Sequence, residues 1–256
     1  MSVRIIRHEG RIAELVMDRP EAMNAISTEQ AALVGGATAE LAADDSVRVV
    51  LLTSAVDKAF CVGADLKERA GFTTDDFLRQ RETTRAAYGG VLALPMPAIA
   101  LVEGHALGGG FELALSCDLI VASPAATFGL PEVSVGVIPG GGGTQLLTRR
   151  LGYNAAADLI LTARRLTAEQ AGAAGIVDRY DPARPAREVA MELATSIAAN
   201  SPVGTRNAKI AMRRGLDLPL AEGLQIEERA WQRTITSPDR IEGIAAFNEK
   251  RPPRWA

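Results

Sequence analysis

The sequence predicts an α/β core followed by an all-helical C-terminal segment. Three observations support this fold class. Apolar runs rich in β-branched residues alternate with helix-period segments through the first 180 residues, glycine-rich turns follow two of those runs, and beyond residue 180 only helical patterns remain. We therefore place the α/β core at residues 1–198 and the helical segment at residues 199–256.

The strand predictions rest on apolar runs bounded by turn residues. The run at residues 47–53 is β-branched and typical of a buried strand, and the strand pattern before it ends at the turn Asp18-Arg19-Pro20. Strand patterns cover residues 11–17, 47–53, 98–103 and 118–122, with a last extended stretch at residues 176–180.

The helix predictions rest on capping residues and on prolines at helix starts. Ser27 with Gln30 resembles a capping box, and the dipeptides Ser201-Pro202, Leu218-Pro219 and Ser237-Pro238 separate the last helices. Helical patterns cover residues 27–43, 73–94, 108–117, 182–199, 203–214, 220–236 and 239–249.

Composition narrows the classes of function. The chain has 256 residues, of which 47% are apolar and 23% charged, and its formal net charge is -3. A mildly acidic chain lacks the basic excess that binding to a nucleic-acid backbone needs, so we expect no nucleic-acid partner. The longest apolar run, residues 91–102, is short and broken by two prolines, so we expect no membrane partner.

The numbers of cysteines and histidines bear on the cellular compartment and on metal binding. Cys61 and Cys117 are too few for a disulfide framework, and the start of the chain has no apolar signal region, so we expect a cytoplasmic protein. With only His8 and His105, and no HExxH or CxxC motif, we expect no metal site.

Two segments of the chain share the same order of predicted elements. The run at 47–53 leads to Ala59–Leu66, and the run at 98–103 leads to Gly104–Glu112. Each reads as a strand, a glycine turn and a helix start, an arrangement that leaves backbone N–H groups unpaired at the turn.

Two glutamates lie beside these glycine-rich turns. Glu112 follows Gly108-Gly109-Gly110 in an apolar helical turn, and Glu132 precedes the run Gly140–Gly143. Read singly, Glu112 is a surface residue that compensates the helix dipole and Glu132 an exposed loop residue. Together they suit paired acid–base chemistry, and we expect the glycine run to bring backbone amides to Glu132.

Five stretches in order resemble the crotonase family, the enoyl-CoA hydratase/isomerase family. They are Arg19–Ile26, Ala59–Lys67, Glu103–Leu113, Phe128–Glu132 with Gly136–Thr144, and Ala246–Arg251. The resemblance covers nearly the whole chain. It implies a ClpP-like spiral of ββα repeats with a C-terminal helical region that assembles homotrimers, often paired into hexamers. It also implies an acyl-CoA thioester substrate and no cofactor, because coenzyme A is part of the substrate.

The resemblance also implies roles for individual residues. The backbone N–H groups of Ala64 and Gly109 match the family's oxyanion hole, which holds the thioester carbonyl. Glu112 matches the residue that activates water, Glu132 the proton donor, and Gly140 an N–H group near Glu132 or the water. A proton donor near neutral pH requires that the pKa of Glu132 be raised by desolvation or a partner.

Further positions match contacts to the CoA thioester. These are Ala22, Met23, Ala64, Asp65, Leu66, Lys67 and Gly109, with Phe247 and Lys250 matching a pair that often reaches the CoA of a neighbouring subunit. Lys67 can equally be a solvated helix lysine, and Phe247 an apolar helix anchor. Phe111 is larger than its counterpart in some relatives, and we expect it to narrow the acyl pocket.

The leading interpretation is a 2-enoyl-CoA hydratase that adds water in the syn sense to a trans-2-enoyl-CoA and yields a 3-hydroxyacyl-CoA. Isomerisation needs one carboxylate, so the pair favours hydration. Other acyl-CoA enzymes of the family, including enoyl-CoA isomerases and carnitinyl- or branched-chain enoyl-CoA hydratases, stay open, as does a non-catalytic binding protein. A serine peptidase of the Clp type is disfavoured because no GxSxG motif occurs.

Overall fold

A six-stranded sheet organises the body of the molecule, in the order β1-β2-β3-β5-β7-β10. The computed structural model describes residues 2–255. The first two strands pair antiparallel and the others parallel. The strands are β1 (Val3–His8), β2 (Ile12–Met17), β3 (Val49–Ser54), β5 (Ala98–Val102), β7 (Leu119–Ala122) and β10 (Arg179–Tyr180). The predicted α/β class is confirmed.

A smaller sheet of four strands, β4-β6-β8-β9, lies beside the first. Its strands are β4 (Ala59–Cys61), β6 (His105–Leu107), β8 (Thr127–Gly129) and β9 (Leu166–Thr167). Three times in succession a strand of the large sheet is followed in the chain by a strand of the small sheet, as β3-β4, β5-β6 and β7-β8. Strands β4, β6 and β8 pair parallel with one another. This is the repeating strand pair that the crotonase resemblance implies.

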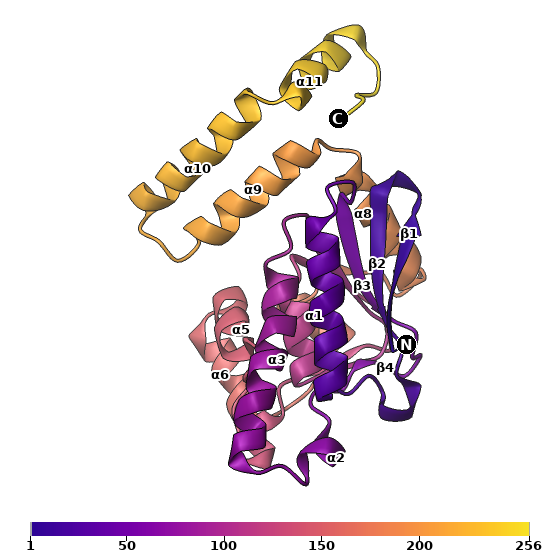
Figure 1. The fold of residues 1–256 in the computed structure, drawn as a ribbon, viewed down its shortest axis with the longest axis vertical. Helices are drawn as coiled ribbons and strands as arrows, with labels where there is room; N and C mark the ends of the chain where they lie inside the picture. Colours follow the sequence, from indigo (N-terminus) through magenta and orange to yellow (C-terminus); the bar gives the residue numbers. More distant parts are fainter. Residues whose placement is uncertain (1, 256) are drawn as a thin grey trace.

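Helices cover both faces of the large sheet (Figure 1). The helices of the body are α1 (Thr28–Ala43), α2 (Leu66–Arg69), α3 (Thr74–Leu92), α4 (Gly109–Ser116), α5 (Gly143–Leu151), α6 (Tyr153–Thr162), α7 (Ala168–Ala173) and α8 (Ala186–Ala198). Short 3-10 turns add η1 (Glu9–Arg11), η2 (Pro20–Ala22) and η3 (Glu132–Val135). Helices α5 and α6 were not among the predicted elements.

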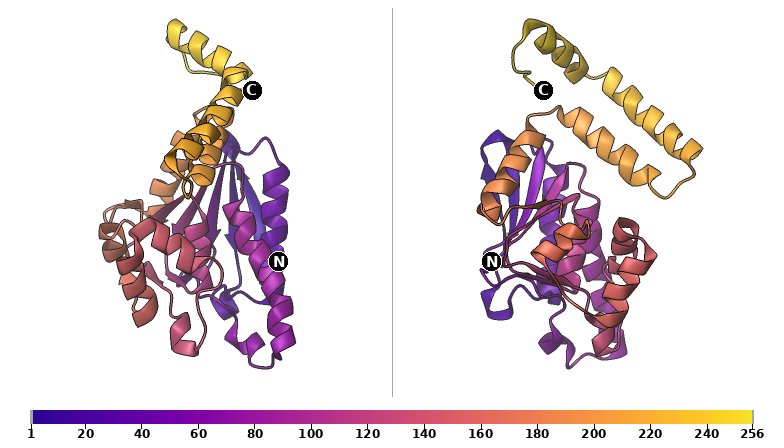
Figure 2. Two further views of the ribbon diagram at one scale, coloured as in Figure 1. Left: turned by 90° about the vertical axis from the view of Figure 1, so that its left-hand side faces the viewer. Right: turned by 180° about the vertical axis from the view of Figure 1, so that it is seen from behind.

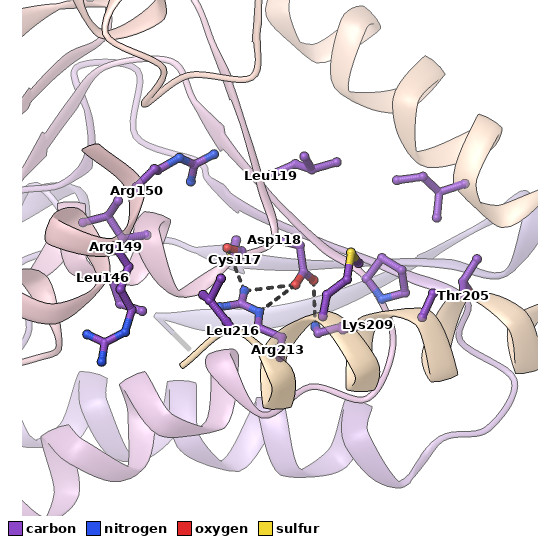
Figure 3. A pocket seen from close by; sticks show the side chains of 15 residues that line it. Cys117, Asp118, Leu119, Leu146, Arg149, Arg150, Thr205, Lys209, Arg213 and Leu216 are labelled. Atoms are coloured by element: carbon purple, nitrogen blue, oxygen red, sulfur yellow. Dashed lines mark hydrogen bonds and ion pairs between the residues drawn. The ribbon is translucent and has the colours of Figure 1, made fainter. Parts of the chain in front are cut away.

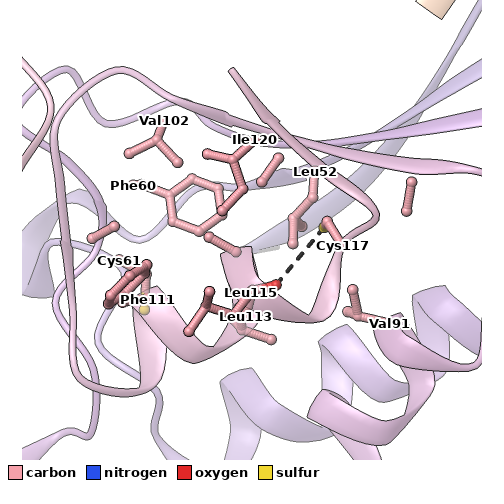
Figure 4. Close-up of a cluster of buried hydrophobic side chains, with 14 of the residues drawn as sticks. Leu52, Phe60, Cys61, Val91, Val102, Phe111, Leu113, Leu115, Cys117 and Ile120 are labelled. Carbon is pink, nitrogen blue, oxygen red and sulfur yellow. Dashed lines mark hydrogen bonds between the residues drawn. The ribbon is translucent and has the colours of Figure 1, made fainter. Parts of the chain in front are cut away.

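Alternate residues of the central strands face two separate apolar clusters. On one face Val49, Leu51 and Leu101 pack against α8, whose small residues recur every fourth position as Ala186, Ala190, Ala194 and Ala198. On the other face the sheet packs against α1, α3 and α4. Figure 4 shows this second cluster, where Phe60 lies between the strands and α4. The period-2 alternation of strand residues dictates this division.

Phe111 belongs to that core. Its side chain is 1% exposed, and its ring packs edge to face against Phe128 at a centroid distance of 5.4 Å. The ring thus packs into the apolar cluster, and the narrowing of the acyl pocket by Phe111 stays a prediction.

Three C-terminal helices project from the body as an arm (Figures 1 and 2). They are α9 (Pro202–Gly215), α10 (Leu220–Ile235) and α11 (Pro238–Glu249). Helices α9 and α10 lie side by side and antiparallel in all three views. The prolines that predicted the helix starts occupy the first helical position of α9 and α11, where the missing N–H group costs nothing.

Element ends differ from the predictions in identifiable ways. Ser27 caps α1 by accepting the backbone N–H of Gln30, but the Gln30 side chain donates to the Ser2 carbonyl oxygen, so the capping box is only half formed. Helix α8 begins at Ala186, later than predicted, because Pro185 is its extended N-cap residue. The extended stretch at 176–180 forms a strand only at Arg179–Tyr180.

Candidate active site

Glu112 is buried in the first turn of α4. This helix follows strand β6 through Gly108, whose φ of 51° lies in the region that favours glycine. The Glu112 side chain is 2% exposed. Its Oε1 atom accepts hydrogen bonds from the backbone N–H groups of Gly141 and Gly143, each at 2.7 Å. The N–H group of Gly142 also lowers the pKa of this carboxyl group.

Glu132 approaches from η3, directly after strand β8. Its carboxyl group lies against Gly108, since a β-carbon added at Gly108 would be 2.9 Å from Oε1. Its Oε2 atom is buried and has no hydrogen-bond partner among the described residues. Twenty positions apart in sequence, Glu112 and Glu132 thus flank the same glycine turn.

The two carboxyl groups have different electrostatic surroundings. Burial, followed by the nearby charge of Glu112, raises the pKa of Glu132 to about 7. Burial also raises the pKa of Glu112, but the N–H groups of Gly143 and Gly141 and the charge of Arg81 oppose that rise. Burial thus raises the pKa of both carboxyl groups, but only at Glu112 do backbone N–H groups and a nearby arginine oppose the rise.

Two glycine turns meet beside these carboxyl groups. Gly63 has a φ of +91°, and a β-carbon there would lie 3.1 Å from the Gly109 nitrogen. Ala64 follows Gly63 and forms an isolated bridge with Ile26. Gly109 begins α4, so its N–H group has no acceptor within the helix. The turns that carry Ala64 and Gly109 are thus in contact, on the side of α4 where Glu132 lies.

The glycine run after Glu132 serves the other carboxylate. We expected it to bring amides to Glu132, but the N–H groups of Gly141 and Gly143 bind Glu112 instead. The carbonyl oxygen of Gly140 accepts a hydrogen bond from Arg81 on α3. The chain folds back over α4 after η3, and this return, which spacing alone does not show, decides which glutamate the amides reach.

Tyr88 is a site residue that sequence reasoning missed. It lies on α3 and is 8% exposed. Its hydroxyl group would be 2.2 Å from a β-carbon at Gly109, and its ring 2.7 Å from one at Gly141. Burial and the charge of Glu112 raise the pKa of Tyr88, so it stays neutral. Only the tertiary packing of α3 on α4 places it here, and no local motif marks it.

The residues matched to CoA binding in the N-terminal third cluster around η2 and α2. Ala22 ends η2, and Met23 follows it in a left-handed conformation with 43% of its surface exposed. Leu66 and Lys67 begin α2 and are exposed. These side chains are accessible to a ligand.

Asp65 differs from its neighbours because its side chain is 7% exposed and already engaged. It accepts the N–H groups of Lys67 and Glu68 as the N-cap of α2 and forms an ion pair with Arg19 at 2.8 Å. Asp65 therefore fixes the start of α2, which follows Ala64, through these contacts.

Phe247 and Lys250 are not brought to this site within one chain. Both lie at the end of α11, at the opposite end of the molecule from α2 (Figure 1). Phe247 is 81% exposed.

A different cavity, of about 570 Å³, lies between α9 and the body. Figure 3 shows Asp118 at its centre, where it pairs with Lys209 at 2.7 Å and with Arg213 at 3.0 Å. Neither Glu112 nor Glu132 lines this cavity. Its ion pairs are internal to the protein, so it is not the candidate active site.

Metal binding, reactive thiols and membrane-spanning helices were each sought in residues 2–255. No group of three or more His, Cys, Asp or Glu side chains there is arranged to hold a metal ion. Burial raises the pKa of both Cys61 and Cys117 to about 12, which keeps these thiols protonated. No helix in the described part of the chain has the length and hydropathy needed to cross a membrane.

Comparisons with known proteins agree on one family. The family model described as enoyl-CoA hydratase/isomerase matches residues 7–256. The chain is 43% identical over 240 residues to YngF of Bacillus subtilis (strain 168), whose name places it among enoyl-CoA hydratases/isomerases; the match covers 94% of this chain and 92% of YngF. It is 39% identical over 260 residues to the mitochondrial methylglutaconyl-CoA hydratase of Mus musculus, covering 100% of this chain and 83% of the mouse protein. The crystal structure of an enoyl-CoA hydratase from Bacillus anthracis superposes with a TM-score of 0.97 at 38% identity, covering 100% and 99% of the two chains.

Proposed function

Because the chain belongs to the enoyl-CoA hydratase/isomerase family, we propose that it adds water across the double bond of a trans-2-enoyl-CoA. The observation that carries this proposal is the pair of unlike carboxyl groups around one glycine turn. Oε1 of Glu112 accepts two backbone N–H groups, while Oε2 of Glu132 is buried with no partner in the described chain. These unlike surroundings support Glu112 as the base and Glu132 as the acid.

The proposed reaction begins at the carboxylate of Glu112. Oε2 takes a proton from water as the water oxygen bonds to C3 of the enoyl group. The C2–C3 π electrons move toward the thioester carbonyl, whose oxygen gains negative charge. The N–H groups of Ala64 and Gly109 stabilise that charge. Glu132 then donates its proton to C2, and proton exchange with solvent restores both carboxyl groups.

Gly140 contributes to this scheme through its place in the loop. Its carbonyl oxygen accepts from Arg81, and the next N–H group, that of Gly141, binds Glu112. We propose that Gly140 shapes the water site beside the two carboxyl groups and that the reaction needs no metal or cofactor, because the thioester itself accepts the electrons.

Substitution of each glutamate tests the proposal. We expect Glu112→Gln and Glu132→Gln each to lower kcat for crotonyl-CoA hydration at least about a hundredfold, with unchanged circular dichroism. Glu169→Gln, on the exposed surface of α7, is the matched control and is expected to retain full activity. Near-normal turnover by either active-site variant would contradict the hydratase assignment.

A screen of thioesters with different acyl groups would identify the preferred substrate. One relative is named a methylglutaconyl-CoA hydratase, so branched and dicarboxylic thioesters belong beside crotonyl-CoA in the screen. Conversion of a 3-enoyl-CoA to its 2-enoyl isomer, without net water addition, would instead identify an isomerase.

We also propose that the chain assembles as a trimer or a pair of trimers through its C-terminal arm. The arm exposes many large apolar side chains, more than a free surface usually carries. They are Met212, Leu216, Leu220, Leu224, Trp231, Ile241, Ile244 and Phe247. In such an assembly Phe247 and Lys250 would reach the CoA bound by a neighbouring subunit. The cytoplasmic location expected from the sequence stays a prediction.

A further inference from the structure

A pocket of about 340 Å³ lies between helix α3 and the glycine run that follows Glu132. Arg81, Arg85 and Tyr88 line one wall, while Gly141 and Thr144 belong to the other. Residues 81, 85 and 88 are spaced by four and three positions, so they share one face of α3.

The pocket adjoins the candidate active site. Tyr88 lines it, and the hydroxyl group of the same residue packs against Gly109, the second proposed oxyanion donor. Gly141 also lines it, and its N–H group binds Glu112 at 2.7 Å. The pocket and the candidate active site therefore share Tyr88 and the loop that contains Gly141.

The two arginines of the pocket form no ion pair among the described residues, although the charge of Arg81 acts on Glu112. Within residues 2–255, neither Arg81 nor Arg85 forms an ion pair, although Arg79 on the same helix pairs with Asp76 at 2.5 Å. Arg81 donates only to the neutral carbonyl oxygen of Gly140. Like charges four residues apart on a helix repel each other, so the pair lowers helix stability unless an anion lies between them.

We propose that Arg81 and Arg85 bind a carboxylate at the distal end of the acyl chain, so that the preferred substrate is the CoA thioester of an unsaturated dicarboxylic acid. This inference rests on the proposed hydratase function. Arginine presents a planar fork of N–H donors that matches a carboxylate, and such charge-assisted hydrogen bonds are among the stronger ones in proteins.

The geometry also limits the length of the acyl group. A single peptide unit, that between Gly140 and Gly141, connects the Arg81 hydrogen bond to the Glu112 hydrogen bond. Arg81 thus lies across one peptide unit from Glu112, and the matching substrate would carry its carboxylate one or two carbons beyond C3. Glutaconyl-CoA, a five-carbon diacid thioester, has this arrangement.

The test compares two thioesters of the same shape and different charge. In 5-methylhex-2-enoyl-CoA, two methyl groups replace the two carboxylate oxygens of glutaconyl-CoA. We expect the wild-type ratio of kcat/KM, glutaconyl to 5-methylhexenoyl, to be at least about ten. Arg85→Gln is expected to remove that preference, and Arg85→Lys, which keeps the charge, to retain part of it. Arg79→Gln, outside the pocket, should leave the ratio unchanged.

Three results would overturn the inference. The first is a wild-type preference for the neutral thioester. The second is an Arg85→Gln variant in which kcat/KM is unchanged for both thioesters, as expected of a solvated arginine. The third is an equal loss for both thioesters in that variant, as expected if Arg85 binds a phosphate of CoA.

Calorimetric binding of the saturated analogues glutaryl-CoA and 5-methylhexanoyl-CoA separates this inference from the proposed function. If no enoyl thioester is hydrated, the hydratase assignment fails. Tighter binding of glutaryl-CoA that depends on Arg85 would still support the carboxylate site, and equal binding of the two analogues would contradict it.

Discussion

The hydroxyl group of Tyr88 lies directly over Gly109, so that a β-carbon at Gly109 would be only 2.2 Å away from it. The next nearest atom of Tyr88 to that β-carbon would be the ring carbon Cζ, at 3.4 Å. The hydroxyl oxygen alone therefore makes this position too tight for alanine. The contact joins α3, which lines the proposed acyl pocket, to the start of α4, which carries a proposed oxyanion donor.

This contact predicts a compensating pair of substitutions. Gly109→Ala should lower both the melting temperature and crotonyl-CoA hydration, since either Tyr88 or the Gly109 N–H group must move. Adding Tyr88→Phe removes the clashing oxygen and should restore most of the lost stability. Thermal unfolding of the two single variants and the double variant measures the coupling. Strictly additive losses would show that the contact does not limit position 109.

The pKa of Glu132 predicts the pH dependence of catalysis. Its carboxyl group must be protonated to act as the acid, and that pKa is about 7. We therefore expect kcat/KM for hydration to fall about tenfold per pH unit above about 7, since this quantity reports the free enzyme. Activity should also fall at acidic pH, where Glu112 gains a proton. A profile of kcat/KM that stays flat from pH 6 to 9 would contradict the acid role of Glu132.

The same group predicts a pH dependence of stability. The pKa of Glu132 is raised from 4.5 to about 7 on folding, so the folded state holds its proton over that interval while the unfolded state releases it. The contribution of Glu132 to stability is thus complete below about pH 4.5 and is lost as the pH rises through about 7. Glu132→Gln should melt near the wild-type temperature at pH 4.5 and above it at pH 8. A lower melting temperature of the variant at pH 8 would be the contrary result.

The alanine stripe of α8 predicts a close approach of helix and sheet. Ala194 is fully buried against the central strands. Ala194→Leu should therefore overpack this layer and lower the free energy of unfolding by about 1–3 kcal/mol. Thr195→Leu, on the exposed side of the same helix, is the matched control and should change it little. Equal effects in denaturant titrations would argue against tight packing at the stripe.

The exposed apolar face of the arm predicts an assembly. Light scattering at micromolar concentration should give three or six times the chain mass of 27.0 kDa. Phe247→Ser should weaken the binding of CoA thioesters if this side chain, 81% exposed in the single chain, reaches a neighbouring site. A mass of one chain would contradict the proposed trimer.

Long, locally encoded elements could be predicted from the sequence. Strands β3 and β5 lie in apolar runs between turns. Ser27, Pro202 and Pro238 mark helix starts through capping and φ preferences that act within a few residues. The short strands β4, β6 and β8 have three residues each, too few to show a period, and only the family resemblance implied them.

The site was predictable only where a motif carries it. Glu112 and Glu132 stand beside glycine turns, which local sequence reveals. The packing of α3 over α4, however, brings Tyr88 and Arg81 to those turns. Contacts of this kind between distant segments cannot be predicted from a local sequence motif. For the same reason, the sequence alone could not show that the amides of the glycine run reach Glu112 rather than Glu132.

The stereochemistry of water addition in D2O tests the central claim most directly. If Glu112 and Glu132 act from one side of the double bond, crotonyl-CoA should give a single 3-hydroxybutyryl-CoA diastereomer with deuterium at C2 added syn to the hydroxyl group at C3, as read from proton NMR couplings. An anti product, a mixture of diastereomers, or no hydration at all would contradict the account.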